Sequence, residues 1–105
     1  MKWVDGRQKS GYLKSTFFQF KRLDMHLIKY PEGASIPEHI DAVEYGKHYR
    51  LNIILKQPKK GGIFKCDKTI IDWKNVKLFR SDIHKHSVTK IDIGERVVLS
   101  IGVIL

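Results

Sequence analysis

The sequence predicts an all-β fold, a sandwich, barrel or jelly roll with little or no helix. Two observations support this prediction. Helical periodicity is nearly absent, whereas short runs rich in Ile, Val, Leu, Phe and Tyr recur along the whole chain. Turn-forming residues also separate these runs at close spacing. With 105 residues, the chain has the size of one small domain.

The expected strands follow one another in eight runs. The first two, residues 12–20 and 25–30, are rich in aromatic and aliphatic side chains, and the third is a short run at 35–40. Three short apolar runs follow, bounded by glycine, proline or asparagine: 49–56, 62–66 and 76–79. An Asp-Ile-Gly-Glu turn separates the last two runs, 86–91 and 96–105. Any helix is expected early in the chain or as a single turn over residues 71–74.

Charge is the one unusual feature of the composition. Twenty Lys and Arg against eleven Asp and Glu give a formal net charge of +9, spread along the chain. An anionic partner, such as nucleic acid or an acidic protein surface, would explain this excess. The simpler explanation is a basic but unspecialised surface in contact with solvent.

Several features favour a cytoplasmic protein that does not cross a membrane. No apolar run approaches the ~20 residues that span a bilayer. The first residues lack the apolar segment of a signal peptide. A single cysteine, Cys66, allows no internal disulfide and fits a reducing compartment.

A possible metal site begins with His39 and Asp41, which are two residues apart and therefore project to the same face of a strand or strand end. His86 would have to arrive from a strand far away in sequence. Two imidazoles and one carboxylate occupy one face of Fe(II) and leave the opposite face open to substrate and O₂. The bare His-x-Asp tripeptide by itself favours a surface histidine beside a turn aspartate.

The surrounding motifs favour the metal site. Residues 86–96 fit the pattern H-x-V-x-x-I-x-x-G-x-R, Tyr30-Pro31-Glu32-Gly33 precedes His39-Ile40-Asp41, and the run at 50–55 is followed by Gly61-Gly62. Over roughly residues 25–103 these motifs resemble the Fe(II)/2-oxoglutarate-dependent dioxygenases, in particular their prolyl-4-hydroxylase-like branch. The resemblance implies a double-stranded β-helix, the cupin-like jelly roll. One domain, 1–105, would then consist of a short lead-in, 1–24, and a barrel, 25–105, that carries the metal.

The resemblance also implies roles for individual residues. His39, Asp41 and His86 would be the Fe(II) ligands, and Arg96 would pair with the distal carboxylate of the cosubstrate 2-oxoglutarate. Further cosubstrate contacts would come from Tyr30, from Ser100, which shares strand parity with Arg96, and from Asn52 on the opposite wall. The implied reaction hydroxylates a protein or another macromolecule with O₂ while 2-oxoglutarate becomes succinate and CO₂.

Strand geometry restricts how His86 and Arg96 can share one site. In a flat hairpin the two residues would be about five positions apart along the sheet, on the order of 16 Å at ~3.3 Å per residue. A five-carbon diacid is shorter than that. We therefore expect the two residues on opposing sheets of a jelly roll.

Alternatives remain for individual residues. His84 competes with His86 as third ligand, although the ten-residue spacing to Arg96 favours His86. His26 is expected in the core or at a rim, and His48 at the surface. The loop 41–47 should lie at the barrel mouth, where substrate contacts are expected. Aromatic residues fit either a small core or a surface that stacks on bases: Trp3, Phe17, Phe18, Phe20 and Trp73.

Two further functions compete with the dioxygenase. One is a catalytically silent jelly-roll module whose basic surface binds nucleic acid or an assembly partner. The other is a cupin-type metalloenzyme without 2-oxoglutarate, which would leave Arg96 without a role. The sequence leaves the substrate and the oligomeric state open.

Overall fold

The structure is a computed structural model that describes residues 3–5 and 11–105, and those residues form strands and no helix. None of the described residues belongs to a helix that is long and apolar enough to cross a membrane. The strands are β1 (Val4–Asp5), β2 (Leu13–Gln19), β3 (Leu23–Tyr30), β4 (Ile36–His39), β5 (His48–Lys56), β6 (Lys60–Gly61), β7 (Phe64–Cys66), β8 (Ile71–Trp73), β9 (Val76–Arg80), β10 (His86–Val88), β11 (Ile91–Ile93) and β12 (Arg96–Ile104).

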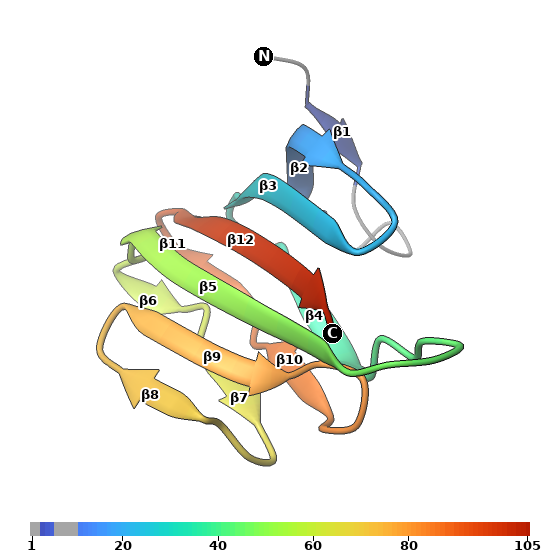
Figure 1. The fold of residues 1–105 in the computed structure, drawn as a ribbon. Coiled ribbons are helices and arrows are strands. Elements are labelled where there is room, and N and C mark those ends of the chain that lie inside the picture. Colours follow the sequence, from blue (N-terminus) through green and yellow to red (C-terminus); the bar gives the residue numbers. More distant parts are fainter. Residues whose placement is uncertain (1–2, 6–10) are drawn as a thin grey trace.

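The strands form two layers, as Figure 1 shows. One layer is a seven-stranded antiparallel sheet in the order β1-β2-β3-β12-β5-β9-β8. Facing it are a three-stranded sheet, β4-β10-β7, and the short pair β11-β6. The last strand, β12, lies in the middle of the large sheet between β3 and β5, which is the return of late strands onto early ones that a jelly roll requires. The predicted all-β jelly roll is confirmed.

The alternation of side chains along β12 divides the large sheet into two faces. Arg96, Val98, Ser100 and Gly102 point into the molecule and are buried, whereas the residues between them lie on the outer face and are half-buried. The register carries this alternation into the neighbouring strands. The inward row of β3 is Asp24, His26, Ile28 and Tyr30, and that of β5 is His48, Arg50, Asn52 and Ile54.

The interior between the layers is apolar at one end and polar at the other. Near the start of β12, Tyr30, Ile54 and Val98 of the large sheet and Tyr12, which precedes β2, pack with Ala34, Val88 and Ile91 from the opposite side. Toward the end of β12, the inward residues become Ser100 and Gly102, flanked by the charged residues of β3 and β5. The apolar end holds the layers together, and the polar end leaves room for a site.

The boundaries differ from the predicted ones in four places. Residues 71–73 form strand β8 instead of a helical turn, because they pair with β9. The expected run 86–91 is divided into β10 and β11, which pair with different partners. The two-residue strands β1 and β6 were not expected, because pairs this short carry no periodicity. The lead-in, 1–24, contributes β1 and β2 to the edge of the large sheet, and β3 begins within it, at Leu23.

Candidate metal centre

His39 and His86 are brought together by strand pairing. They are directly opposite each other on the antiparallel strands β4 and β10, and their ring centroids are 4.3 Å apart. Asp41 follows β4, where its backbone N–H donates to the carbonyl of Ser81. Its carboxylate lies 3.5 Å from His39 Nε2 and 3.3 Å from His86 Nε2. Ligand atoms of all three residues lie within 4.8 Å of one another, so one ion can contact all of them.

The hydrogen bonds of the two imidazoles determine which nitrogen faces the site. His39 Nδ1 is 2.8 Å from the carbonyl oxygen of Pro37, and His86 Nδ1 is 2.9 Å from that of His84. A carbonyl can only accept, so each Nδ1 carries the proton. The Nε2 atoms of both rings therefore face the Asp41 carboxylate and are the atoms available to a metal ion. Backbone carbonyls that orient histidines in this way are typical of metal sites.

A cavity of about 630 Å³ opens beside these three residues. Its volume is within the range of ligand-binding pockets. The expected cosubstrate residues Tyr30, Asn52 and Ser100 all line it, together with the three candidate ligands. The third-ligand alternative, His84, is half-buried and lies outside the cluster, to which it contributes its backbone carbonyl.

Arg96 occupies a different position from the other expected cosubstrate residues. Its side chain is 1% exposed and does not line the cavity. One guanidinium nitrogen donates to the Gly62 carbonyl at 3.3 Å, and the guanidinium carbon lies 5.6 Å from the centroid of the Tyr30 ring. Tyr30 thus contacts both the cavity and Arg96. Within the described part of the chain no carboxylate is in ion-pair contact with Arg96, and its buried Nε has no hydrogen-bond partner.

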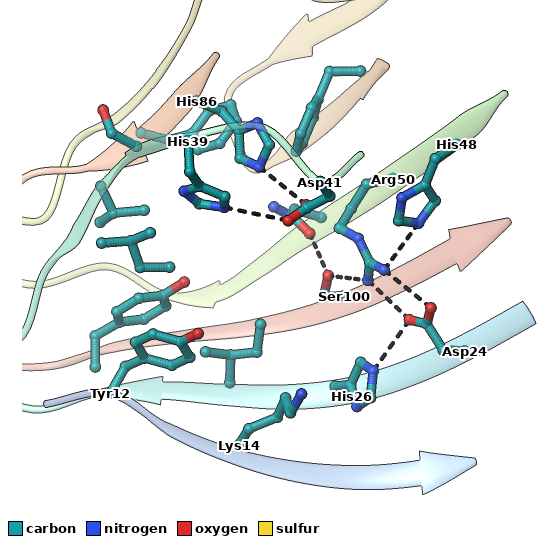
Figure 2. Close-up of a pocket in the computed structure, with 18 of the residues that line it drawn as sticks. Tyr12, Lys14, Asp24, His26, His39, Asp41, His48, Arg50, His86 and Ser100 are labelled. Carbon is teal, nitrogen blue, oxygen red and sulfur yellow. Dashed lines mark hydrogen bonds and ion pairs between the residues drawn. The ribbon is translucent and has the colours of Figure 1, made fainter. Parts of the chain in front are cut away.

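A second polar network, absent from the sequence predictions, lines the cavity on the large sheet (Figure 2). Arg50 lies 3.0 Å from each carboxylate oxygen of Asp24 and donates to Ser100 Oγ at 2.9 Å. Ser100 Oγ in turn donates to Asn52 Oδ1 at 2.7 Å. Arg50 and Asp24 lie on the strands either side of β12 and meet across Gly102, where any Cβ would overlap the guanidinium. The glycine therefore makes this ion pair possible.

Two further histidines belong to this network, and the pKa of each is lowered. His48 Nε2 is 3.2 Å from Arg50, which can only donate, so Nδ1 carries the proton and donates to Ser81 Oγ at 2.9 Å. Burial, and next the charge of Arg50, lower the pKa of His48. Burial, and next the charge of Lys14, also lower the pKa of His26, whose Nε2 lies 3.2 Å from Asp24.

His48 was expected at the surface, and that prediction is wrong, because the residue begins β5 and is buried with its ring toward the cavity. The sequence did contain a signal for it. His48, Arg50 and Asn52 alternate along one run, so a strand that begins one residue earlier places all three on the same face.

Comparisons with known proteins agree with the observed architecture. No family model matches the chain, and no curated protein sequence matches it. Among solved structures, the Schizosaccharomyces pombe Cnp3 cupin domain is similar with a TM-score of 0.67 and 14% identity over 100% of this chain and 69% of that chain. KdgF from Halomonas sp. gives 0.63 and 13% over 100% and 87%.

A chain in the complex of Rhodobacter sphaeroides SigE with the anti-sigma ChrR is also similar, with a TM-score of 0.60 and 12% identity. The match covers 95% of this chain and 48% of that one, about half of its length. At these identities the likeness shows the fold alone. The chain folds as a cupin-type jelly roll, and its His-Asp-His cluster fits a metal-binding member of that fold.

Proposed function

We propose that the protein is an Fe(II)/2-oxoglutarate-dependent dioxygenase that hydroxylates a macromolecular substrate. The observation that carries the proposal is the donor set: two imidazoles and one carboxylate turned toward one point at a cavity wall. This is the ligand set of non-haem iron oxygenases, which leaves coordination positions for cosubstrate and O₂. When bound, iron would supply the O₂ activation that protein side chains cannot provide.

The residues of the chain would hold and orient that ion. The Pro37 and His84 carbonyls fix the two rings by accepting from Nδ1, so that little reorganisation is needed when Nε2 takes a metal. The aromatic ring of Phe79 packs 4.9 Å from the ring of His86 and restricts its rotation further. The site is thus preorganised before the metal binds.

The assignment to 2-oxoglutarate is supported by Arg96. A buried guanidinium without a carboxylate partner is costly, because burial removes its hydration and nothing neutralises its charge. A bound dicarboxylate would supply the missing anion, and a planar guanidinium suits a carboxylate. Tyr30, which contacts Arg96 and lines the cavity, would have to turn aside or share that carboxylate.

Arg50, unlike Arg96, lines the cavity beside the metal cluster, and it is less suited to this role. Asp24 already neutralises it, and Ser100 and His48 occupy further donors. A cosubstrate carboxylate would have to displace Asp24. The unneutralised cation, Arg96, is therefore the better partner for a dicarboxylate.

A metal-binding cupin that uses no 2-oxoglutarate is the second candidate. The three ligands and the cupin-type fold support it as well as they support the dioxygenase. The dioxygenase and the metal-binding cupin differ in the role of Arg96. Without 2-oxoglutarate, no bound anion would pair with its buried charge.

Anaerobic titration tests the proposal directly. The protein is titrated with Fe(II) and then with 2-oxoglutarate, and the visible charge-transfer band of a bidentate complex is recorded. Succinate formation is then measured in air with and without Fe(II). We expect the band and metal-dependent succinate in the unmodified protein, and loss of both in His39→Ala and His86→Ala.

His84→Ala is the matched control, because it removes a neighbouring imidazole but leaves the backbone carbonyl that orients His86. It should retain the band. Fe(II) binding with neither a band nor succinate would overturn the 2-oxoglutarate assignment in favour of the simpler metal-binding cupin.

A further inference from the structure

The cavity is bordered at one end by a surface that combines exposed aromatic rings with cations. Two segments form it: the β2–β3 turn, with Phe20, Lys21 and Arg22, and the loop 41–47, with Tyr45 and Lys47. We call these five residues the rim. Both segments lie at the end of the large sheet where β12 ends (Figure 1).

The rim is continuous with the cavity because residues on either side of each segment line that cavity. Gln19 and Asp24 lie on either side of the turn, Asp41 begins the loop, and His48 follows it. A long substrate that reaches the metal cluster from this end must pass over the rim.

The backbone holds the two rim segments in place. In the turn, Phe20 N–H donates to the Leu23 carbonyl at 2.7 Å, and the Arg22 carbonyl accepts from Ile104 N–H at 2.9 Å. In the loop, Lys47 and Leu105 exchange two backbone hydrogen bonds of 3.0 and 2.9 Å. Both segments are therefore tied to the end of the chain, and their side chains are presented at a fixed spacing.

The aromatic rings of the rim are exposed. Phe20 is 67% exposed and Tyr45 is 48% exposed, and the Phe20 ring is supported by Phe18 at a centroid distance of 5.7 Å. Isolated large apolar side chains are common on protein surfaces. The rim instead has two exposed aromatic rings at the same cavity mouth, each beside a cation. Nucleic-acid bases stack on such rings, and every base has an aromatic face that can do so.

The cations of the rim are not neutralised. Lys21 Nζ lies 5.6 Å and Arg22 Cζ 5.3 Å from the centroid of the Tyr45 ring. In the part of the chain that the structure describes, neither they nor Lys47 forms an ion pair with a carboxylate, although the nearby loop carries Glu44. Some lysines elsewhere do form ion pairs, as Lys29 and Lys56 do with Glu95.

We infer that the rim binds single-stranded nucleic acid, with phosphates on Lys21, Arg22 and Lys47 and bases stacked on Phe20 and Tyr45. This specifies the substrate class of the proposed dioxygenase and rests on that function for turnover, whereas the binding itself requires no metal. The net charge of +9 adds long-range attraction for a polyanion. An acidic peptide would satisfy the cations but would leave the two exposed rings without a stacking partner.

Fluorescence anisotropy with labelled oligothymidylate and oligouridylate tests the inference without iron or 2-oxoglutarate. Both probes offer phosphates and bases, and comparing them shows whether the rim binds DNA or RNA. Neutralising three phosphates should make the logarithm of the association constant fall with the logarithm of salt at a slope of roughly −2. Lys21→Glu with Arg22→Glu should weaken binding at least about tenfold and flatten that slope.

Phe20→Leu separates stacking from charge, because it keeps an apolar side chain and every cation. We expect it to weaken binding about fivefold or more, the effect of losing one stacked base. Lys59→Glu with Lys90→Glu is the matched control: it makes the same charge change on exposed residues at the opposite end of the molecule. It should change affinity little.

Three outcomes would overturn the inference. Equal weakening by the Lys59/Lys90 control would show attraction by net charge alone. An unchanged affinity in Phe20→Leu, with equal competition by polyglutamate, would identify an acidic peptide as the partner. No binding by either oligonucleotide at low salt would exclude nucleic acid. His39→Ala should bind both oligonucleotides like the unmodified protein, because binding requires no metal. A failure of the dioxygenase proposal would therefore leave this binding unchanged.

Discussion

Arg96 carries a positive charge in the interior, where a guanidinium with few partners is costly to the folded state. Replacement by methionine, Arg96→Met, should therefore leave the free energy of unfolding unchanged or raise it, since buried charges are often replaced by apolar groups without loss. The same change should raise the KM for 2-oxoglutarate by roughly 10–100-fold, the effect of one lost charge-assisted hydrogen bond. Denaturant unfolding and succinate assays measure the two effects separately.

Arg96→Lys is the control for the shape of the group, because it keeps the charge and loses the planar pair of donors. We expect an intermediate KM. Fe(II) binding in the absence of cosubstrate should be the same in all three proteins. If Arg96→Met unfolds more readily and its KM is unchanged, Arg96 is a structural residue.

His48 makes stability depend on pH. Burial and then Arg50 lower its pKa in the folded protein, whereas in the unfolded chain it takes up a proton near the usual ~6.5. Below that pH the unfolded state binds more protons, so stability falls as the pH falls, by at most about 1.4 kcal/mol per pH unit for one histidine. His48→Gln should reduce this slope in urea unfolding between neutral and mildly acidic pH.

His26, whose pKa is also lowered, should sustain the remaining slope in that variant. His84→Gln serves as the comparison, since the His84 side chain is half-buried and belongs neither to the Arg50 network nor to the metal cluster. An equal loss of slope in both variants would contradict a specific role of His48.

At this scale the candidate ligands were predictable and the Arg50 network was not. The spacing of His39 and Asp41 places both on one face of a strand, and the resemblance of the surrounding motifs to the dioxygenases implied them as ligands together with His86. The pairing of Arg50 with Asp24 depends on which residues of β3 and β5 stand opposite Gly102. That register is set by long-range strand pairing, which local sequence does not specify.

Among the elements, the short β6–β11 pair depends on a glycine. Gly61 has φ of +79°, and a Cβ there would overlap the Lys90 carbonyl oxygen and lie 2.8 Å from Asp92 N. Gly61→Ala should therefore cost at least about 3 kcal/mol of stability, combining a left-handed backbone with a steric clash.

A substitution at Gly33 distinguishes the cost of the left-handed backbone from the cost of the steric clash. Its φ is +86°, and nothing lies within 4 Å of a Cβ added there. Gly33→Ala should cost only the conformational part, about 1–2 kcal/mol. Denaturant midpoints measure both, and equal costs would show that the approach of Lys90 to Gly61 is unimportant.

Most long strands could be predicted, and the short ones could not. Runs such as 49–56 and 96–105 carry enough alternating or continuous apolar residues to identify a strand. β8 consists of three exposed residues, and pairing with β9 decides its conformation. The division of β10 from β11 likewise reflects two different partner strands, a tertiary effect without a local signal.

For the molecule as a whole, a bound metal would connect the segment after β4 to β10 and stabilise the smaller sheet. A ligand that binds only the folded state at a hundred times its Kd adds about 2.7 kcal/mol. For a domain of this size that corresponds to a rise in Tm of roughly 10–20 °C. We expect this rise with anaerobic Fe(II), measured by circular dichroism.

His39→Ala should abolish the rise, and His84→Ala should keep it. A similar rise in all three proteins would place the stabilising ion elsewhere. For the whole molecule, strand content and turn spacing restricted a chain of 105 residues to a sandwich, a barrel or a jelly roll, and the cupin-like jelly roll among these came from the resemblance of its motifs.

The alternation along β12 has a consequence for how this protein tolerates change. The same nine residues supply the buried Arg96 and Ser100 on one face and a half-buried apolar row on the other. Deleting one residue within the strand would exchange the faces for every position beyond it, and would place apolar side chains in the cavity and polar ones outside. The loop 41–47 has no such parity to preserve. Length variation should therefore accumulate in the rim and be almost absent from β12, so that specificity can diverge while the metal-binding scaffold stays the same.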